Sequence, residues 1–436
     1  MMMMMMMMSG RTSVIQRMVL HMLQYETYVR TLMYMVYDDA RALGTPVVAS
    51  ARRAMDARCA RAMSTSMASS FASRRVRASR GTRARRTTTR CARASPLDAL
   101  ELTRATRCAR ASNFVYKGDD VERFMAMDGF TLRARGVTGA TGWAVCDDVA
   151  SGERFVVVRG AAWNQPDTDR NKLSWQIAKA WPQKVWRSTP ETPVVGHQGV
   201  LEMVEEFWGQ ASPWLSDETF TGTFRFAGHS LGGSMALVLA VRARLELGIE
   251  ESRLGSVCTF GAPPVLAYDR LSASARARAD ETVDADEILR ILGFKRGASF
   301  VHQYVLAKDI IPRMWLSADP VFAAATSNEF IGGLLDWRRD VFGEGVLTKN
   351  RFLYESIGDL YWLEYASGEQ GTPSLTRYDD DDVLKKLSMN LDDITESPLA
   401  ALRTIGEHNS QSYVDALQFL TVREVINPGS QSNATP

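Results

Sequence analysis

The stretch 223–233, TFRFAGHSLGG, decides the fold of this chain. Its alternating phenylalanines predict a β-strand, and the long apolar run at 231–247 predicts a helix. Between them lies Ser230, flanked by Gly228 and Gly232 in the pattern GxSxG. A strand-to-helix turn this sharp needs glycines, because larger neighbours would clash with it. The pattern predicts that Ser230 projects from the edge of a sheet as a nucleophile; the alternative is a serine that caps the helix.

The rest of the chain from residue 97 alternates predicted strands and helices, which favours a mostly parallel sheet covered by helices on both faces, with insertions. The longest departures from this alternation are 266–297 and 315–396, which we interpret as insertions. The predicted elements are a helix in 97–116, a hairpin in 142–160 with a buried strand at 155–158, a helix at 199–208, and strands in 256–265 and 300–311.

The chain divides by composition into a leader at 1–96, a catalytic domain at 97–425 and a disordered tail at 426–436. The leader contains 17 arginines, no lysine and 4 acidic residues among many Ala, Ser and Thr, which is typical of an organelle transit peptide. A basic arm that binds nucleic acid is the alternative. No nucleic-acid-binding motif supports that alternative. The rest of the chain, residues 97–436, is acidic, with 35 basic and 46 acidic residues.

The composition also argues against a transmembrane protein and a metalloprotein. Hydrophobic residues make up 45% and charged residues 23% of the chain, as in soluble globular proteins, and no apolar run reaches the roughly 18 residues of a membrane span. The five cysteines form no CxxC pair, and the acidic run at 379–382 lacks the spacing of a calcium loop. We therefore expect no metal and no organic cofactor.

A catalytic triad on such a sheet follows the chain order serine, acid, histidine. His408 is the suitable histidine downstream of Ser230, whereas His302 precedes the candidate acid, begins a predicted strand and is interpreted as structural. Asp309 follows the strand in 300–311 and is the predicted acid, since parallel strands gather their sites at their carboxyl ends. Acids that compete on chain order alone are Asp359, Asp392 and Asp393.

The negative charge on a tetrahedral intermediate needs fixed donors. In this arrangement one donor is the backbone amide after the nucleophile, here Leu231, and another comes from the turn after an earlier strand. Ala161, in the Gly-containing turn that follows the strand at 155–158, is the predicted second donor.

Six segments in order, FVVVRGA, VGHQGV, GHSLGG, FGAPPV, AKDIIPRM and EHNSQSYVDAL, resemble the class 3 (fungal-type) lipases from about residue 97 to 420. The resemblance implies an α/β-hydrolase fold, hydrolysis of acylglycerols or polar glycerolipids, and a triad of Ser230, Asp309 and His408. It also implies a lid near 163–186. One departure is Ala161, where the family usually has Thr or Ser, so a side-chain donor to the oxyanion is lost.

The resemblance and the leader together predict a lipid acyl-ester hydrolase that meets its glycerolipid at a membrane or lipid-droplet surface. The predicted location is the chloroplast, with the mitochondrion or cytoplasm as alternatives. Two other functions stay open: a non-catalytic lipase-like scaffold, and an esterase or acyltransferase that acts on soluble esters. The tryptophans at 163, 175, 181 and 186 either cover the site as a lid or pack in the core.

Overall fold

The computed structural model describes residues 99–162, 165–179, 182–186, 194–268, 285–309, 311–313, 354–365, 372–378, 387 and 408–426. The predicted leader, the acidic run at 379–382 and residues 427–436 of the predicted tail lie outside these residues. No helix in the described ranges is long and apolar enough to cross a membrane.

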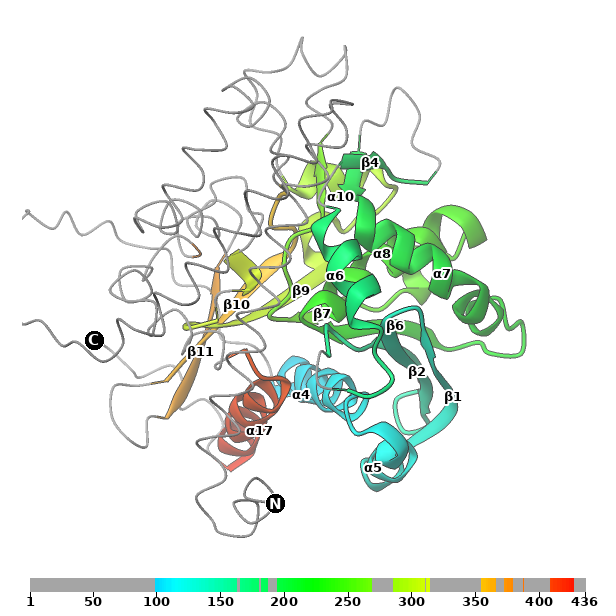
Figure 1. Ribbon diagram of the computed structural model, residues 1–436. Coiled ribbons are helices and arrows are strands. Elements are labelled where there is room, and N and C mark those ends of the chain that lie inside the picture. The colour runs from blue at the N-terminus through cyan, green and yellow to red at the C-terminus, as the bar shows by residue number, and fades with distance from the viewer. Residues whose placement is uncertain are drawn as a thin grey trace, which may run out of the picture. The chain divides into compact units, whose positions relative to one another are not determined.

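The described core contains an eight-stranded sheet in the order β1-β2-β3-β6-β7-β9-β10-β11 (Figure 1). Strands β3, β6, β7, β9 and β10 run parallel, whereas β1 and β2 at one edge and β11 at the other are antiparallel to their neighbours. The bounds are β1 (Phe130–Thr138), β2 (Thr141–Asp148), β3 (Glu153–Val158), β6 (Thr223–His229), β7 (Val257–Phe260), β9 (Val301–Leu306), β10 (Asp359–Tyr365) and β11 (Pro373–Tyr378). The mostly parallel sheet is the predicted one.

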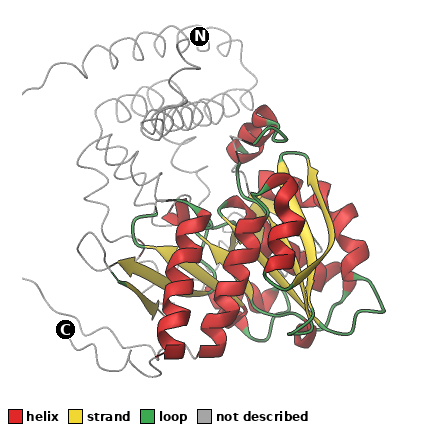
Figure 2. Ribbon diagram, turned by 90° about the horizontal axis from the view of Figure 1, so that it is seen from below, coloured by secondary structure: helices red, strands yellow, loops and turns green. Residues whose placement is uncertain are grey.

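Helices cover both faces of this sheet, as Figure 2 shows. On one face lie α4 (Ala99–Phe114), α5 (Val121–Met127) and α17 (Ser410–Ile426), whose buried side chains pack with alternate residues of the strands. On the other lie α7 (Gln198–Leu215) and α8 (Leu231–Leu247). Successive strand residues point to opposite faces, so Phe155 and Val157 join the first cluster, and Val156 and Val158 the second.

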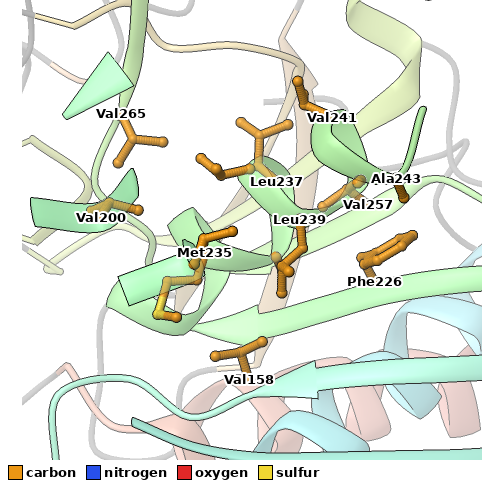
Figure 3. Packing of buried hydrophobic residues seen from close by; sticks show 14 of the residues in the cluster. Val158, Val200, Phe226, Met235, Leu237, Leu239, Val241, Ala243, Val257 and Val265 are labelled. Atoms are coloured by element: carbon orange, nitrogen blue, oxygen red, sulfur yellow. The ribbon is translucent and has the colours of Figure 1, made fainter. Parts of the chain in front are cut away.

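The second cluster holds the helix that follows Ser230 against the sheet. Figure 3 shows Val158 and Phe226 from the strands facing Met235 and Leu239 of α8. All four side chains are at most 1% exposed. Buried apolar area of this kind stabilises a fold by about 25 cal/mol per Å², so the turn at Ser230 is anchored on both sides by core packing.

The remaining elements lie around these layers. A second sheet has the order β4-β5-β8, and α10 packs near β8. Their bounds are β4 (Pro182–Lys184), β5 (Val194–His197), β8 (Leu266–Tyr268), α6 (Arg170–Ala178) and α10 (Ala285–Ile291), with 3-10 helices η1 (Gly118–Asp120), η2 (Glu251–Arg253), η3 (Gly297–Phe300) and η4 (Ile311–Arg313).

The interpretation of 315–396 as an insertion is wrong for part of that range. Strands β10 and β11 lie within it and extend the main sheet beyond β9. The first five residues of β10, DLYWL, are buried, as expected of a strand covered on both faces. The range 266–297 contains β8 and α10, and residues 269–284 lie outside the described chain.

Candidate active site

Four parallel strands end at the same edge of the main sheet. Register pairs join Val158 of β3 to Gly228 of β6, His229 of β6 to Phe260 of β7, and Phe260 to Tyr304 of β9. The residues that follow these strands therefore meet above one edge, where parallel sheets place their sites. Ser230, Gly261 and Asp309 all follow strands of this group.

Ser230 has the strained backbone that the GxSxG pattern predicts. Its φ is 59° and its ψ −137°, and within the described ranges it is the one non-glycine residue with positive φ. Its backbone N–H donates to Phe260 O at 2.8 Å, and its side chain makes no capping hydrogen bond although it precedes α8. The capping alternative therefore has no support here. Such strain persists only where the surroundings enforce it, and it is common at active sites.

The glycines of the motif bring α8 against the neighbouring strand. A Cβ on Gly232 would stand 2.1 Å from Val158 O, and one on Gly228 would stand 2.3 Å from the carbonyl carbon of Gly232. Both contacts are too close for any side chain, so these two positions require glycine. The close approach brings the amino end of α8 directly beside the end of β3.

Asp309 and His408 form a hydrogen-bonded pair, although they are far apart in the chain. Asp309 Oδ2 lies 2.6 Å from His408 Nδ1. The aspartate is fully buried and accepts two further hydrogen bonds, from Tyr413 Oη at 2.7 Å and from the Ile311 N–H at 2.9 Å. Tyr413 lies in the first turn of α17, so the helix that follows His408 also holds its acid partner.

His408 also contacts the turn that carries Ser230. Its ring stacks on His229 with 4.5 Å between the ring centroids and 29° between the planes. Its Nε2 is buried and has no hydrogen-bond partner in the described part of the chain, so no bond joins it to Ser230 Oγ there. The structure thus brings Asp309 and His408 together and sets His408 against the residue before Ser230.

The two competing residues that the structure describes, His302 and Asp359, lie near the starts of their strands and away from this edge. His302 is the second residue of β9 and lies 3.5 Å from Glu101, by a polar cavity of about 270 Å³ that Arg225 and Tyr304 also line. Burial and nearby arginines lower the pKa of His302 to about 4. Asp359 begins β10 and binds Arg377 at 2.8 Å. Asp392 and Asp393 lie outside the described residues.

The two predicted oxyanion amides belong to turns in direct contact. Leu231 is the first residue of α8, where N–H groups have no partner within the helix. Ala161 follows Gly160, and a Cβ on Gly160 would lie 2.5 Å from His229 O and 2.7 Å from Ser230 Cβ. The Gly160 amide itself donates to Tyr116 Oη at 2.9 Å. No sequence motif pointed to Tyr116, because it stands alone just after a helix.

The lid region is described only in part. Trp163, Trp181 and the side chain of Trp175 lie outside the described residues. Trp186 donates from Nε1 to Glu205 at 3.1 Å, and the Arg242 guanidinium lies over its ring at 4.4 Å. Trp186 therefore packs on α7 and α8 rather than standing free. The lid itself stays a prediction.

Comparisons with known proteins agree with the sequence motifs. The family model Lipase (class 3) matches residues 182–318, which contain Ser230 and Asp309. Phospholipase A1 PLIP2, chloroplastic, of Arabidopsis thaliana is 27% identical over 264 residues, covering 59% of this chain and 31% of that protein. Phospholipase A1 PLIP1, chloroplastic, of the same plant is 26% identical over 226 residues, covering 51% and 29%. The chain thus spans about a third of the length of these relatives.

Solved structures of lipases are similar to this chain at low sequence identity. A triacylglyceride lipase of Rhizomucor miehei is 16% identical, with coverage of 73% of this chain and 98% of that chain and a TM-score of 0.45. A triacylglycerol lipase whose catalytic centre is a serine protease triad is 17% identical, with 74% and 99% coverage and a TM-score of 0.44. The family match and the two plant relatives agree that this part of the chain is similar to the class 3 lipases.

Proposed function

We propose that this protein is a serine hydrolase of lipid acyl esters, with Ser230 as nucleophile, His408 as general base and Asp309 as the residue that orients His408. The observation that carries the proposal is the 2.6 Å hydrogen bond between Asp309 and His408 beside the strained turn of Ser230. A nucleophile, a base and an orienting acid are the parts that acyl transfer by a serine requires.

The hydrogen bond between Asp309 and His408 determines which tautomer of the imidazole is favoured. A buried carboxylate next to Nδ1 favours the tautomer with a proton on Nδ1, which leaves the lone pair on Nε2. That nitrogen has no partner within the described residues and is available to accept the Ser230 hydroxyl proton. Ser230 Oγ then attacks the ester carbonyl, the alcohol leaves with the proton from His408, and water releases the fatty acid from the acyl-enzyme.

The backbone amides of Ala161 and Leu231 would hold the negative oxygen of the tetrahedral intermediate. Support comes from the close approach of the turn at Gly160 to the turn at Ser230, where a Cβ on Gly160 would lie 2.7 Å from Ser230 Cβ. Donors fixed in this way are worth on the order of 100-fold or more in rate each. Because Ala161 has no hydroxyl, its contribution is the backbone amide alone.

We infer that the substrate is a glycerolipid and that a phospholipid is the first to test. Two relatives carry the name phospholipase A1. The resemblance to class 3 lipases also implies hydrolysis of acylglycerols or polar glycerolipids. The enzyme would meet such a substrate at a membrane or droplet surface. The chloroplastic relatives and the arginine-rich, acid-poor leader together favour a plastid.

The test is fatty-acid release by the full chain from phosphatidylglycerol vesicles, triacylglycerol emulsion and a soluble short-chain ester. We expect release from the vesicles, loss of that release in Ser230→Ala, and full release in Ser216→Ala, a matched control at an exposed serine outside the site. Release from the soluble ester alone would favour the soluble esterase. A folded wild type that releases no fatty acid from any substrate would favour the scaffold and refute the proposal.

A further inference from the structure

Tyr116, just beyond the end of α4, joins the two turns that surround Ser230. Its hydroxyl accepts the Gly160 N–H at 2.9 Å and lies 3.0 Å from His229 Nδ1. Gly160 is the residue before Ala161, and His229 is the residue before Ser230. We call the chain from the Gly160 amide through the Tyr116 hydroxyl to His229 Nδ1 the Tyr116 bridge.

The direction of the protons in the bridge follows from its two ends. The Gly160 amide can only donate, so the Tyr116 hydroxyl accepts there and has its own proton free for His229 Nδ1. Burial holds the pKa of His229 well below its ordinary value, and the neighbouring His408 lowers it further. His229 is therefore neutral and accepts at Nδ1. Burial also raises the pKa of Tyr116, which keeps the hydroxyl protonated.

The bridge lies next to the reacting groups without being one of them. Tyr116 Oη and Ser230 Cβ each lie 2.7 Å from the same point, the position that a Cβ on Gly160 would take. The ring of His229 stacks on His408 at 4.5 Å. A shift of the Tyr116 hydroxyl would therefore move the oxyanion turn and the nucleophile's turn relative to one another.

Other contacts in the described residues also hold the turn at Ala161. Arg159 holds its start, through a two-bond contact with Asp167 at 2.9 and 3.1 Å. Further along, Gln165 Nε2 donates to the backbone oxygen of Tyr116 at 3.2 Å, so Tyr116 fixes the turn from two sides. Ala161 has no side-chain hydroxyl that could act as a second donor. Its contribution therefore depends on the direction of its N–H, which the backbone sets.

We propose that Tyr116 is a positioning residue of the oxyanion hole, whose hydroxyl ties the Ala161 turn to the turn of Ser230 through His229. The proposal rests on the proposed function, since it assigns the hydroxyl a role in the same reaction. The hydroxyl acts on the transition state, where the oxyanion forms, and leaves binding of the ground-state substrate nearly unchanged. An error of about 1 Å in such a position can lower the rate by about 100-fold.

The test is Tyr116→Phe in the full chain, measured by kcat, by KM, and by the affinity for a boronic acid that forms a tetrahedral adduct with the serine. We expect kcat to fall by about 10-fold or more, the boronate affinity to fall by a similar factor, and KM to change less than about twofold. The matched control is Tyr361→Phe, which also removes a hydroxyl that donates at 3.0 Å, to Glu101, but far from Ser230. It should leave kcat and boronate affinity unchanged.

A second pair of variants tests the other end of the bridge. His229→Asn keeps a side-chain oxygen that can accept from Tyr116, so its boronate affinity should stay within about threefold of wild type. His229→Leu has no acceptor and should lower the boronate affinity by a factor similar to that of Tyr116→Phe. The proposal is overturned if Tyr116→Phe binds the boronate as tightly as wild type, or if Tyr116→Phe and Tyr361→Phe lower kcat and boronate affinity equally. A wild type that neither hydrolyses lipid nor binds boronate refutes the proposed function instead.

Discussion

In the proposed mechanism Asp309 orients His408, since its fully buried carboxylate lies 2.6 Å from His408 Nδ1. Asp309→Asn places an amide there that can donate to Nδ1, which puts the imidazole proton on Nε2 and leaves no base for Ser230. We expect kcat to fall by about 10⁴-fold with the fold intact. The measurement is fatty-acid release with a circular dichroism spectrum of the same sample.

Asp359→Asn is the matched control for this substitution, since Asp359 binds Arg377 at the start of β10. It should keep kcat within about twofold. Equal losses in the two variants would mean that neither carboxylate acts specifically, and activity retained in Asp309→Asn would remove Asp309 from the proposed triad.

The sequence predicted residues that belong to local motifs and missed those that act through distant contacts. Ser230 stands out because its turn needs glycines, and Asp309 because it follows a strand. Tyr116 and His229 are joined only by the folded chain, across a separation of 113 residues. The pairing of Asp309 with His408 was predicted from chain order, and their catalytic roles remain predictions.

At the scale of elements, the packing of α8 on β3 should be sensitive to any side chain at Gly232. A Cβ there would stand 2.1 Å from Val158 O, so Gly232→Ala must push α8 away from the strand. We expect a loss of about 1 to 3 kcal/mol in the free energy of unfolding and at least about a 10-fold loss of kcat. Urea unfolding and lipid hydrolysis measure the two effects.

Gly209→Ala is the matched control for Gly232→Ala, and we expect it to raise stability where Gly232→Ala lowers it. Gly209 lies within α7, and a Cβ there would meet nothing within 4 Å. Alanine favours a helix over glycine by about 0.5 to 1 kcal/mol, so this variant should be slightly more stable and fully active. A loss of stability in Gly209→Ala similar to that in Gly232→Ala would contradict the packing of α8 on β3.

Elements whose apolar residues recur at a clear helix or strand spacing were predicted. Elements whose burial depends on distant partners were not. The strand, turn and helix around Ser230 and the hairpin of β2 and β3 match the prediction. Strand β10 was missed because its buried run lies among residues with no clear strand pattern, and its place is fixed by pairing with β9 and β11. Strand β1 was missed although its exposure alternates, because its apolar residues are few.

For the whole molecule, a buried neutral histidine makes stability depend on pH. Burial and nearby arginines lower the pKa of His302 to about 4 from 6.5. The unfolded chain binds this proton more tightly, so the free energy of unfolding should fall as pH drops from about 6.5 to about 4. The upper limit of this term is about 3 kcal/mol. Urea unfolding at several pH values should give a shallower dependence in His302→Gln; an unchanged dependence would contradict the assignment.

The central claim is that the folded chain activates Ser230, and covalent labelling with a fluorophosphonate tests it most directly. The full-length wild type should gain one phosphonyl group, located on Ser230 by peptide mass spectrometry, and Ser230→Ala should gain none. Prior incubation with phosphatidylglycerol vesicles should slow the labelling. A folded wild type that stays unlabelled, or a label carried equally by Ser230→Ala, would contradict the account.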